Sequence, residues 1–264
     1  MVWVIADVHG CAETLKKLVD RVLQADPQAQ FVFTGDYCDR GMKSKEVVDY
    51  LLTLDNVLSF LRGNHDDVID WLLNEHSFTD MQEQLGMPPS DESIIPWWKM
   101  NGFISTLESY GVSGHLESRG PYNMGAMPSE LGEEFRDKVP DSHKEFYRNL
   151  EVSWENDTHF AVHAWADPKS ESPLEFQEGS TRPLWNRFPR QFPSGALEYI
   201  EPVWDKIGVF GHTPVSYYRA AAPIKMEKIR LIDCCAFDNE YLTAYCCESD
   251  DWILQATEPE DGRK

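Results

Sequence analysis

Residues 31–41 read FVFTGDYCDRG, and this stretch decides the fold because a short apolar run passes directly into a polar loop bounded by glycines. The run at 31–34 has the β-branched and aromatic composition of a strand. Beyond the loop, apolar residues recur at helical spacing, at Val47, Val48, Leu51 and Leu52. The stretch therefore predicts a strand, a polar loop and a helix in succession.

The same unit occurs on both sides of this stretch. Residues 2–6, VWVIA, lead into the polar loop 7–10 and then into the helical face Leu15, Leu18, Val19, Val22 and Leu23. A third strand at about 57–62 leads into GNHDD and the apolar face Val68, Ile69, Leu72 and Leu73. Three such units predict an α/β protein with a largely parallel sheet, whose polar loops share one edge.

The alternation breaks down from about residue 76 to 150, where Pro88 and Pro89 and a polar stretch predict a mostly helical insertion. Strand patterns resume at about 158–163, 207–211, 229–235, 241–248 and 251–256. These later strands favour a second sheet rich in hairpins. With 264 residues in all, the chain is expected to form a single domain, 1–264, that carries the insertion.

Composition narrows the classes of function. The formal net charge of −21 disfavours nucleic-acid binding, and an anionic substrate would need local cations or bound metal. No segment has the roughly 18 to 20 apolar residues that span a bilayer, and the N-terminus lacks the pattern of a secretory signal. The six cysteines suit reduced thiols, so a cytoplasmic protein without a membrane partner is expected. The sequence leaves the oligomeric state open.

Five polar clusters each follow an apolar strand. They are Asp7-x-His9, Gly35-Asp36-x-x-Asp39-Arg40-Gly41, Gly63-Asn64-His65-Asp66, His163 and Gly211-His212-Thr213. Each cluster is a weak signal alone. Together they can bring carboxylate, imidazole and amide ligands to one sheet edge, and such donors suit Mn²⁺, Fe or Zn²⁺.

At these residues the chain closely resembles the calcineurin-like metallophosphoesterases, and among them the PPP-type serine/threonine protein phosphatases, including small bacterial and phage (lambda-phosphatase-like) members. Trp185-Asn186-Arg187, the VFGHTP stretch at 209–214 and the segment from Ile232-Asp233 to Leu242-Thr243 extend the resemblance. It covers nearly the whole chain apart from the insertion. The resemblance implies a four-layer α-β-β-α metallophosphoesterase sandwich.

The resemblance also implies a dinuclear metal site. Asp7 and His9 would hold the first metal, Asp36 would bridge, and the second metal would be held by Asn64, His163 and His212. Two divalent ions are expected, with Mn²⁺ favoured and Fe or Zn²⁺ left open. A hydroxide bridging the metals would attack phosphorus, so no protein nucleophile is required.

Four further residues receive catalytic roles from the resemblance. His65 would donate a proton to the leaving group, and Asp39 would orient its imidazole and raise its pKa. Arg40 and Arg187 would grip the non-bridging phosphate oxygens in a planar, fork-like manner.

Three functions remain open. The first is a phosphomonoesterase, above all a serine/threonine or dual-specificity protein phosphatase, acting on a phosphorylated protein or a small phosphoester. The second is a symmetrical dinucleoside tetraphosphatase or another nucleotide hydrolase. Asp39 favours the first, because GDxxDRG is typical of protein phosphatases and those hydrolases usually lack the acid. The third, a non-catalytic binding module, requires a missing ligand, and none is missing.

Several features stand outside these motifs. Related chains usually read Asp-Thr-Gly where this chain has Asp233-Cys234-Cys235, and a glycine often follows VHA where this chain has Trp165. The loss of these glycines suggests an altered backbone or a narrower pocket. Cys38 is the better candidate for oxidation, whereas the pairs Cys234/Cys235 and Cys246/Cys247 suit small buried side chains. The segment from Trp97-Trp98 to Tyr110 either lines the cleft or packs the insertion onto the core.

Overall fold

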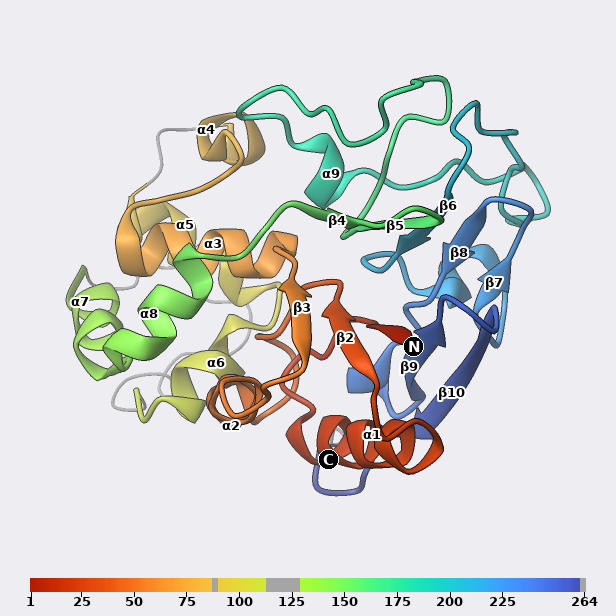
Figure 1. Cartoon of the computed structure of the whole chain (residues 1–264). Coiled ribbons are helices and arrows are strands. Elements are labelled where there is room, and N and C mark those ends of the chain that lie inside the picture. The colour runs from red at the N-terminus through yellow and green to blue at the C-terminus, as the bar shows by residue number, and fades with distance from the viewer. Residues whose placement is uncertain (87–89, 113–128, 262–264) are drawn as a thin grey trace.

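The computed structural model describes residues 1–86, 90–112 and 129–261, and two five-stranded sheets lie at its centre (Figure 1). The first sheet has the order β10-β9-β1-β2-β3, with bounds Asp251–Ala256, Tyr241–Cys246, Val2–Ile5, Gln30–Phe33 and Val57–Phe60. The second has the order β4-β5-β6-β8-β7, with bounds Ser153–Glu155, His159–Val162, Ile207–Phe210, Ile229–Leu231 and Ile224–Lys225.

The first three strands are parallel, as the sequence predicts. β1 pairs with β2 from Val2↔Gln30 to Ile5↔Phe33, and β2 pairs with β3 up to Phe33↔Phe60. The loops that follow these strands therefore leave the sheet at the same edge. A helix follows each loop: α1 (Ala12–Ala25), α2 (Ser44–Leu51) and α3 (Asn64–Asn74).

The expectation that all later strands form the second sheet is wrong for β9 and β10. β9 pairs antiparallel with β1, from Trp3↔Cys246 to Ile5↔Ala244, and β10 extends the same sheet. Without this hairpin β1 would be an edge strand, although all four of its residues are buried. Within the second sheet, β5, β6 and β8 are parallel to one another, so hairpins do not dominate it.

The described part of the segment 76–150 is mostly helical, with short connections between its helices. Its helices are α4 (Met81–Leu85), α5 (Asp91–Lys99), α6 (Phe103–Ser109), α7 (Ser129–Lys138) and α8 (Asp141–Arg148). Residues 87–89 and 113–128 lie outside the described part, so that part of the insertion stays a prediction. Further along the chain are α9 (Arg182–Trp185) and the 3₁₀ turns η1 (Val215–Tyr218) and η2 (Ala236–Asp238).

The two sheets pack against each other through alternating residues of the second sheet. On β5, Ala161 joins the large core of the first sheet, whereas Phe160 and Val162 join a separate core on the other side. Val209 and Phe210 on β6 divide in the same way. Period-two alternation thus places one face of each strand between the sheets. The predicted α/β class, with two sheets and flanking helices, is confirmed.

A buried arginine ties the end of β3 to two helices. Arg62 is 2% exposed, and its guanidinium donates to Asp70 at 2.8 Å and to Asp67 at 3.2 Å, both on α3. It also donates to the carbonyl oxygens of Tyr147 at 3.0 Å and Arg148 at 3.2 Å, the last two residues of α8. This network fixes the helix that begins with Asn64 and His65.

Replacing Arg62 with methionine is expected to lower the free energy of unfolding by about 3–5 kcal/mol, because two buried carboxylates lose their cation. Chemical denaturation of the metal-free protein measures this change. Lys45→Met removes an exposed cation that pairs with Asp49, so it is the matched control, with an expected change within about 0.5 kcal/mol. Equal denaturation midpoints for the two variants would contradict the structural role of Arg62.

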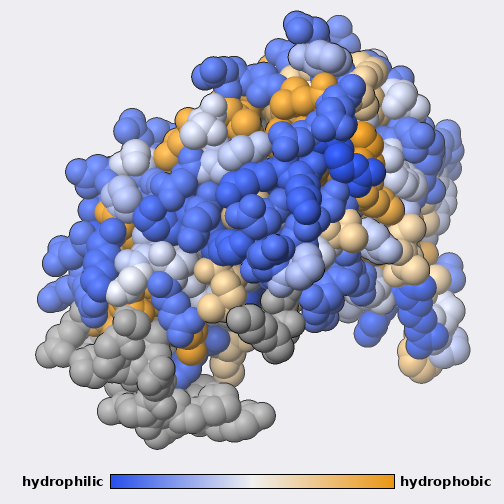
Figure 2. Space-filling model, turned by 90° about the horizontal axis from the view of Figure 1, so that it is seen from below, coloured by the Kyte–Doolittle hydropathy of each residue, from blue (hydrophilic) through white to orange (hydrophobic). Residues whose placement is uncertain are grey.

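The surface of the described residues is mostly polar on the face that Figure 2 draws, with hydrophobic residues in scattered patches. Over the described ranges, none of the helices combines the length and apolar character that crossing a bilayer requires.

Candidate metal centre

Loops from both sheets bring the predicted ligands together at one edge. Asp7 and His9 follow β1, Asp36 follows β2, and Asn64 opens α3, while His163 and His212 follow β5 and β6 of the second sheet. All six side chains are buried, with exposures of 8% or less. The hydrogen bonds between them join residues up to 205 positions apart.

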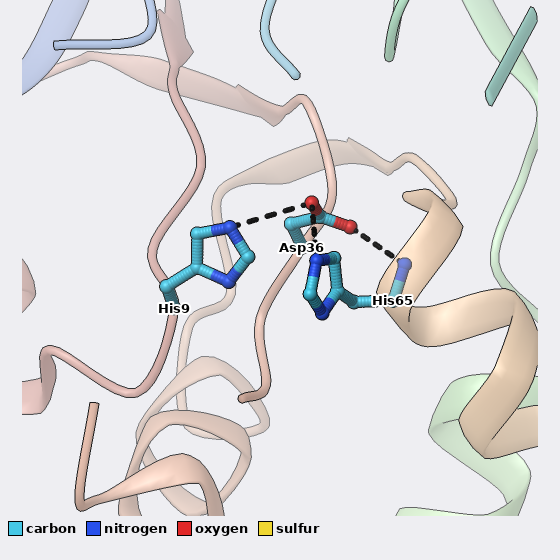
Figure 3. Close-up of side chains that lie close together, drawn as sticks. All are labelled: His9, Asp36 and His65. Atoms are coloured by element: carbon cyan, nitrogen blue, oxygen red, sulfur yellow. Dashed lines mark hydrogen bonds and ion pairs between the residues drawn. The ribbon is translucent and has the colours of Figure 1, made fainter. Parts of the chain in front are cut away.

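Asp36 lies at the centre of this group. Its Oδ2 atom is 3.4 Å from Nε2 of His9 and 3.5 Å from Nε2 of His163. Figure 3 shows Asp36 between His9 and His65, whose Nε2 atom is 3.9 Å away. Two sets of donor atoms are close enough to hold an ion: His9, Asp36 and His65, and Asp36, His163 and His212. Because Asp36 belongs to both sets, its carboxylate can bridge two metals.

Backbone carbonyls set the orientation of three histidines. Nδ1 of His9 lies 2.8 Å from the carbonyl oxygen of Cys38, and Nδ1 of His163 lies 2.8 Å from that of Thr34. Nε2 of His212 lies 3.1 Å from the carbonyl oxygen of Trp185. Each ring donates its proton there, which leaves the opposite nitrogen as a lone-pair donor. Burial lowers the pKa of all three, so the rings stay neutral, as metal ligation requires.

Asn64 completes the second set of donors. Its Oδ1 atom lies 3.0 Å from Nε2 of His163 and 2.9 Å from Nδ1 of His212. The ligating edges of both imidazoles therefore point at the same place as the amide oxygen. These three donors and the shared carboxylate of Asp36 fit a divalent ion with oxygen and imidazole ligands.

Asp7 lies beside the site but outside both sets of donors. Its carboxylate accepts hydrogen bonds from Thr34 Oγ1 at 3.0 Å and from the backbone N–H of His212 at 2.7 Å. Burial, and then the charge of Asp233, raise the pKa of Asp7 well above its usual range; burial and the charge of Asp7 do the same for Asp36. Such a buried cluster of carboxylates is stabilised by bound cations. The ligand role of Asp7 stays a prediction.

The backbone is strained at the predicted site. Five of its residues have positive φ although they are not glycine, with φ between 45° and 69°: His9, Asp36, Asp39, Arg40 and His212. Such conformations are uncommon for residues with a Cβ atom, and they concentrate at functional sites. The fold thus keeps these loops in unfavourable backbone conformations, and these conformations set the directions of the side chains at the site.

Two glycines allow the loops to approach the carboxylates closely. A Cβ atom on Gly63 would lie 2.0 Å from Oδ1 of Asp36, and one on Gly211 would lie 2.0 Å from Oδ1 of Asp7. Any side chain at these positions would displace the carboxylate. Steric crowding by the carboxylates therefore explains why glycine occupies these positions of GNHDD and VFGHTP.

His65 and Asp39 are in direct contact, as predicted. Nδ1 of His65 lies 2.7 Å from Oδ2 of Asp39, whose other oxygen accepts a hydrogen bond from Thr106 Oγ1 at 2.6 Å. The predicted rise in the pKa of His65 is wrong for this structure: burial, the charge of Arg40 and His163 lower it. Burial also raises the pKa of Asp39 to about 7. The predicted orienting contact between Asp39 and His65 is therefore present.

The predicted phosphate-binding arginines lie on one cleft. This cleft of about 480 Å³ is lined by His9 and His212 together with Arg40, Arg187, Asp233, Tyr217 and Phe237. The guanidinium of Arg40 lies 4.5 Å from the ring centre of Phe237, and its buried Nε atom has no hydrogen-bond partner among the described residues. Arg187 lies 5.3 Å from the ring centre of Tyr217. Two cations thus face the place where the metal ligands converge.

Two further residues position the site: Asp66, to which sequence reasoning gave no role, and Trp98, for which it left two roles open. Asp66 accepts hydrogen bonds from the backbone N–H groups of Asp36 at 2.6 Å, Tyr37 at 3.0 Å and Gly63 at 2.9 Å. Its place in GNHDD was the available signal. Trp98 is fully buried with its ring centre 4.6 Å from that of His65, so it packs the insertion onto the site. The side chain of Trp97 is outside the described part.

The cysteines do not form a disulfide in the described structure. All six are buried free thiols, and none belongs to the metal-binding sets of the described residues. Burial raises the pKa of Cys38 well above its usual range, which disfavours the reactive thiolate. The structure therefore argues against Cys38 as an oxidation-sensitive residue.

This arrangement defines a class of protein. Neutral imidazoles, carboxylates and an amide oxygen that converge beneath two arginines form a site for metal-dependent phosphoester hydrolysis. The sequence of residues 1–216 matches the family model of the calcineurin-like phosphoesterases. The chain belongs to this family, whose members use divalent metals.

Curated relatives have a more specific activity. The chain is similar to a symmetrical bis(5′-nucleosyl)-tetraphosphatase of Proteus mirabilis, with 32% identity over 110 residues, or 40% of each chain. It is 25% identical over 173 residues to one of Ectopseudomonas mendocina, which covers 60% of this chain and 61% of the relative. These alignments thus cover less than two thirds of the relatives' lengths.

Solved structures share the fold. A structure provisionally described as a diadenosine tetraphosphatase has a TM-score of 0.57 at 14% identity, over 98% of this chain and 94% of the other. A variant of a cold-active protein tyrosine phosphatase has a TM-score of 0.50 at 15% identity, over 97% and 77%. At these identities the likeness concerns the fold.

Proposed function

We propose that this chain hydrolyses dinucleoside polyphosphates, in the manner of a symmetrical tetraphosphatase, with two divalent metals and Mn²⁺ as the first choice. One observation supports metal-dependent hydrolysis above all others: the carboxylate of Asp36 belongs to both sets of metal-donor atoms. Arg40 and Arg187 line the cleft next to these donors. The curated relatives support this substrate class. The sequence predicts a protein phosphatase first and a dinucleoside tetraphosphatase as the alternative. The relatives favour the tetraphosphatase.

In this proposal the metals, when bound, hold the phosphate and lower the pKa of water to near neutrality. His9 and Asp36 belong to one site, and Asn64, His163 and His212 to the other, with Asp7 beside the first. Arg40 and Arg187 neutralise the phosphate oxygens, which an acidic chain would otherwise repel. Asp39 holds the ring of His65. His65 donates a proton to the departing oxygen once the negative charge of bound phosphate offsets the burial and the charge of Arg40 that lower its pKa.

One observation favours a second candidate, hydrolysis of phosphomonoesters such as phosphoserine or phosphothreonine. Asp39, which contacts His65, comes from the GDxxDRG motif that is typical of protein phosphatases. An alkoxide leaving group needs a proton more than a nucleoside diphosphate does, so an oriented acid has more value there. This candidate requires a cleft that accepts a peptide.

Comparison of three substrates in Mn²⁺ tests the proposal: diadenosine tetraphosphate, p-nitrophenyl phosphate and a phosphothreonine peptide. A kcat/KM at least about tenfold higher for the dinucleotide, with adenosine diphosphate as the only nucleotide product, is the expected result. Preference for the peptide would replace the first candidate with the second. If none of the three is cleaved by protein that carries two metals, both candidates are wrong.

A further inference from the structure

Arg187 lies between two pockets, of which only one contains metal ligands. One is the cleft of about 480 Å³ described above, and the other is a neighbouring pocket of about 450 Å³. We call this neighbour the distal pocket; its lining includes Trp165, Asp167, Lys169, Arg182, Asn186 and Arg187. A ligand that extends from the metal centre past Arg187 would enter it.

The chain connects the distal pocket directly to the metal ligands. Trp165 follows His163 by two residues, and the backbone N–H of Ala164 donates to the carbonyl oxygen of Pro183 at 2.8 Å. At the other end of α9, the carbonyl oxygen of Trp185 lies 3.1 Å from Nε2 of His212. The segment 183–185, which precedes Asn186 and Arg187, is therefore hydrogen-bonded to both segments that carry the predicted histidine ligands His163 and His212.

The distal pocket has the charge that a polyphosphate requires. Lys169, Arg182 and Arg187 line it, against one acidic residue, Asp167. The whole sequence has the opposite balance, with 24 basic and 45 acidic residues. Within the described ranges, none of these three cations forms an ion pair with a carboxylate, unlike many of the surface lysines. Their charge is thus available to an anion.

The same pocket has an aromatic wall. Trp165 is partly buried, and the guanidinium of Arg182 lies 5.9 Å from its ring centre. Nucleobases stack on aromatic rings with little dependence on base identity, and Arg adds a cation–π contribution. A cation cluster next to a tryptophan is the chemistry that binds a nucleoside phosphate.

We infer that the distal pocket binds the far nucleoside phosphate of a dinucleoside polyphosphate, with the base against Trp165 and phosphate oxygens at Lys169 and Arg182. The inference rests on the proposed function and names the part of the chain that selects a long substrate. A substrate with one phosphate occupies only the cleft. Apart from Arg187, which both pockets share, the residues of the distal pocket therefore set KM for the dinucleotide and do not enter the chemical step.

Steady-state kinetics with Mn²⁺-loaded Trp165→Ala, Trp165→Phe and Lys169→Ala/Arg182→Ala tests this assignment. Trp165→Ala and the double variant are expected to raise KM for diadenosine tetraphosphate about tenfold, the size of one stacking or phosphate contact. Trp165→Phe keeps a ring and is expected to stay within about threefold of the wild type. For p-nitrophenyl phosphate, kcat/KM is expected to change less than about twofold. Lys45→Ala, an exposed cation on α2, is the control.

Two failures are distinguishable. If the wild type does not cleave the dinucleotide, the proposed substrate class is wrong, and the inference falls with it. If the wild type cleaves it but the variants keep the wild-type KM, or lose activity equally on both substrates, only the assignment of the distal pocket is overturned. The double variant alters exposed side chains, so it answers the question even if Trp165→Ala does not fold.

Discussion

Asp36→Asn is expected to abolish phosphoester hydrolysis, with a loss of kcat of at least about a thousandfold, because the shared carboxylate would contribute several kcal/mol through the metals that it is proposed to hold. Oδ2 of Asp36 lies within 3.5 Å of histidine nitrogens from both sets of donors. An amide has no negative charge to share between two cations. The variant is therefore expected to bind fewer than two metals per chain.

The same substitution is expected to leave the metal-free protein as stable as the wild type, or more stable. Burial, and then the charges of Asp7 and Asp66, raise the pKa of Asp36, so its ionised form is unfavourable without metal. Asparagine keeps the oxygen that accepts from the backbone N–H of His65 at 2.9 Å, and it tolerates the φ of 52° at this position.

Metal content and thermal unfolding measure both effects in one set of samples. Added Mn²⁺ is expected to raise the Tm of the wild type, since a ligand that binds only the native state stabilises it, and to raise that of Asp36→Asn much less. Asp20→Asn, on the exposed side of α1, is the matched control and keeps the wild-type response. Two tightly bound metals in Asp36→Asn would exclude the bridging role.

The sequence predicts the parallel part of the fold well and the antiparallel part poorly. For β1, β2 and β3, each strand is followed by a loop and a helix, and repetition of that order favours a parallel sheet. The hairpin β9–β10 has a strand pattern too, but the pattern does not name its partner. β1 accepts β9 because Ala244, Tyr245 and Cys246 bury against it, which is a long-range packing effect.

The residues of the candidate site also fall into two groups, those that the sequence predicts and those that it does not. Ligands at strand ends are visible in the sequence because five similar transitions repeat, and the structure brings Asp36, Asn64, His163 and His212 together. Thr106, which holds Asp39 from 67 residues away, has no such signal. The distal pocket is also invisible, since the segment 165–189 has no regular period and its cations gather only on folding.

The second large effect is expected for His65→Asn, whose kcat should fall about a hundred- to ten-thousandfold, the usual range for a positioned proton donor. The structure leaves His65 two roles, because it contacts Asp39 at 2.7 Å and also belongs to a set of donors with His9 and Asp36. Metal analysis separates them. A proton donor can be removed with both metals retained, whereas loss of a ligand lowers the metal content.

The leaving group gives a further test of the same residue. An alkoxide from phosphothreonine needs protonation, whereas p-nitrophenolate leaves readily without it, so His65→Asn should reduce hydrolysis of the peptide far more than that of p-nitrophenyl phosphate. Asp39→Asn keeps the ring but weakens the contact at 2.7 Å, so it should show the same order of substrates with a smaller loss. Equal losses on both substrates, with two metals bound, would mean that His65 acts by holding the phosphate and not by donating a proton.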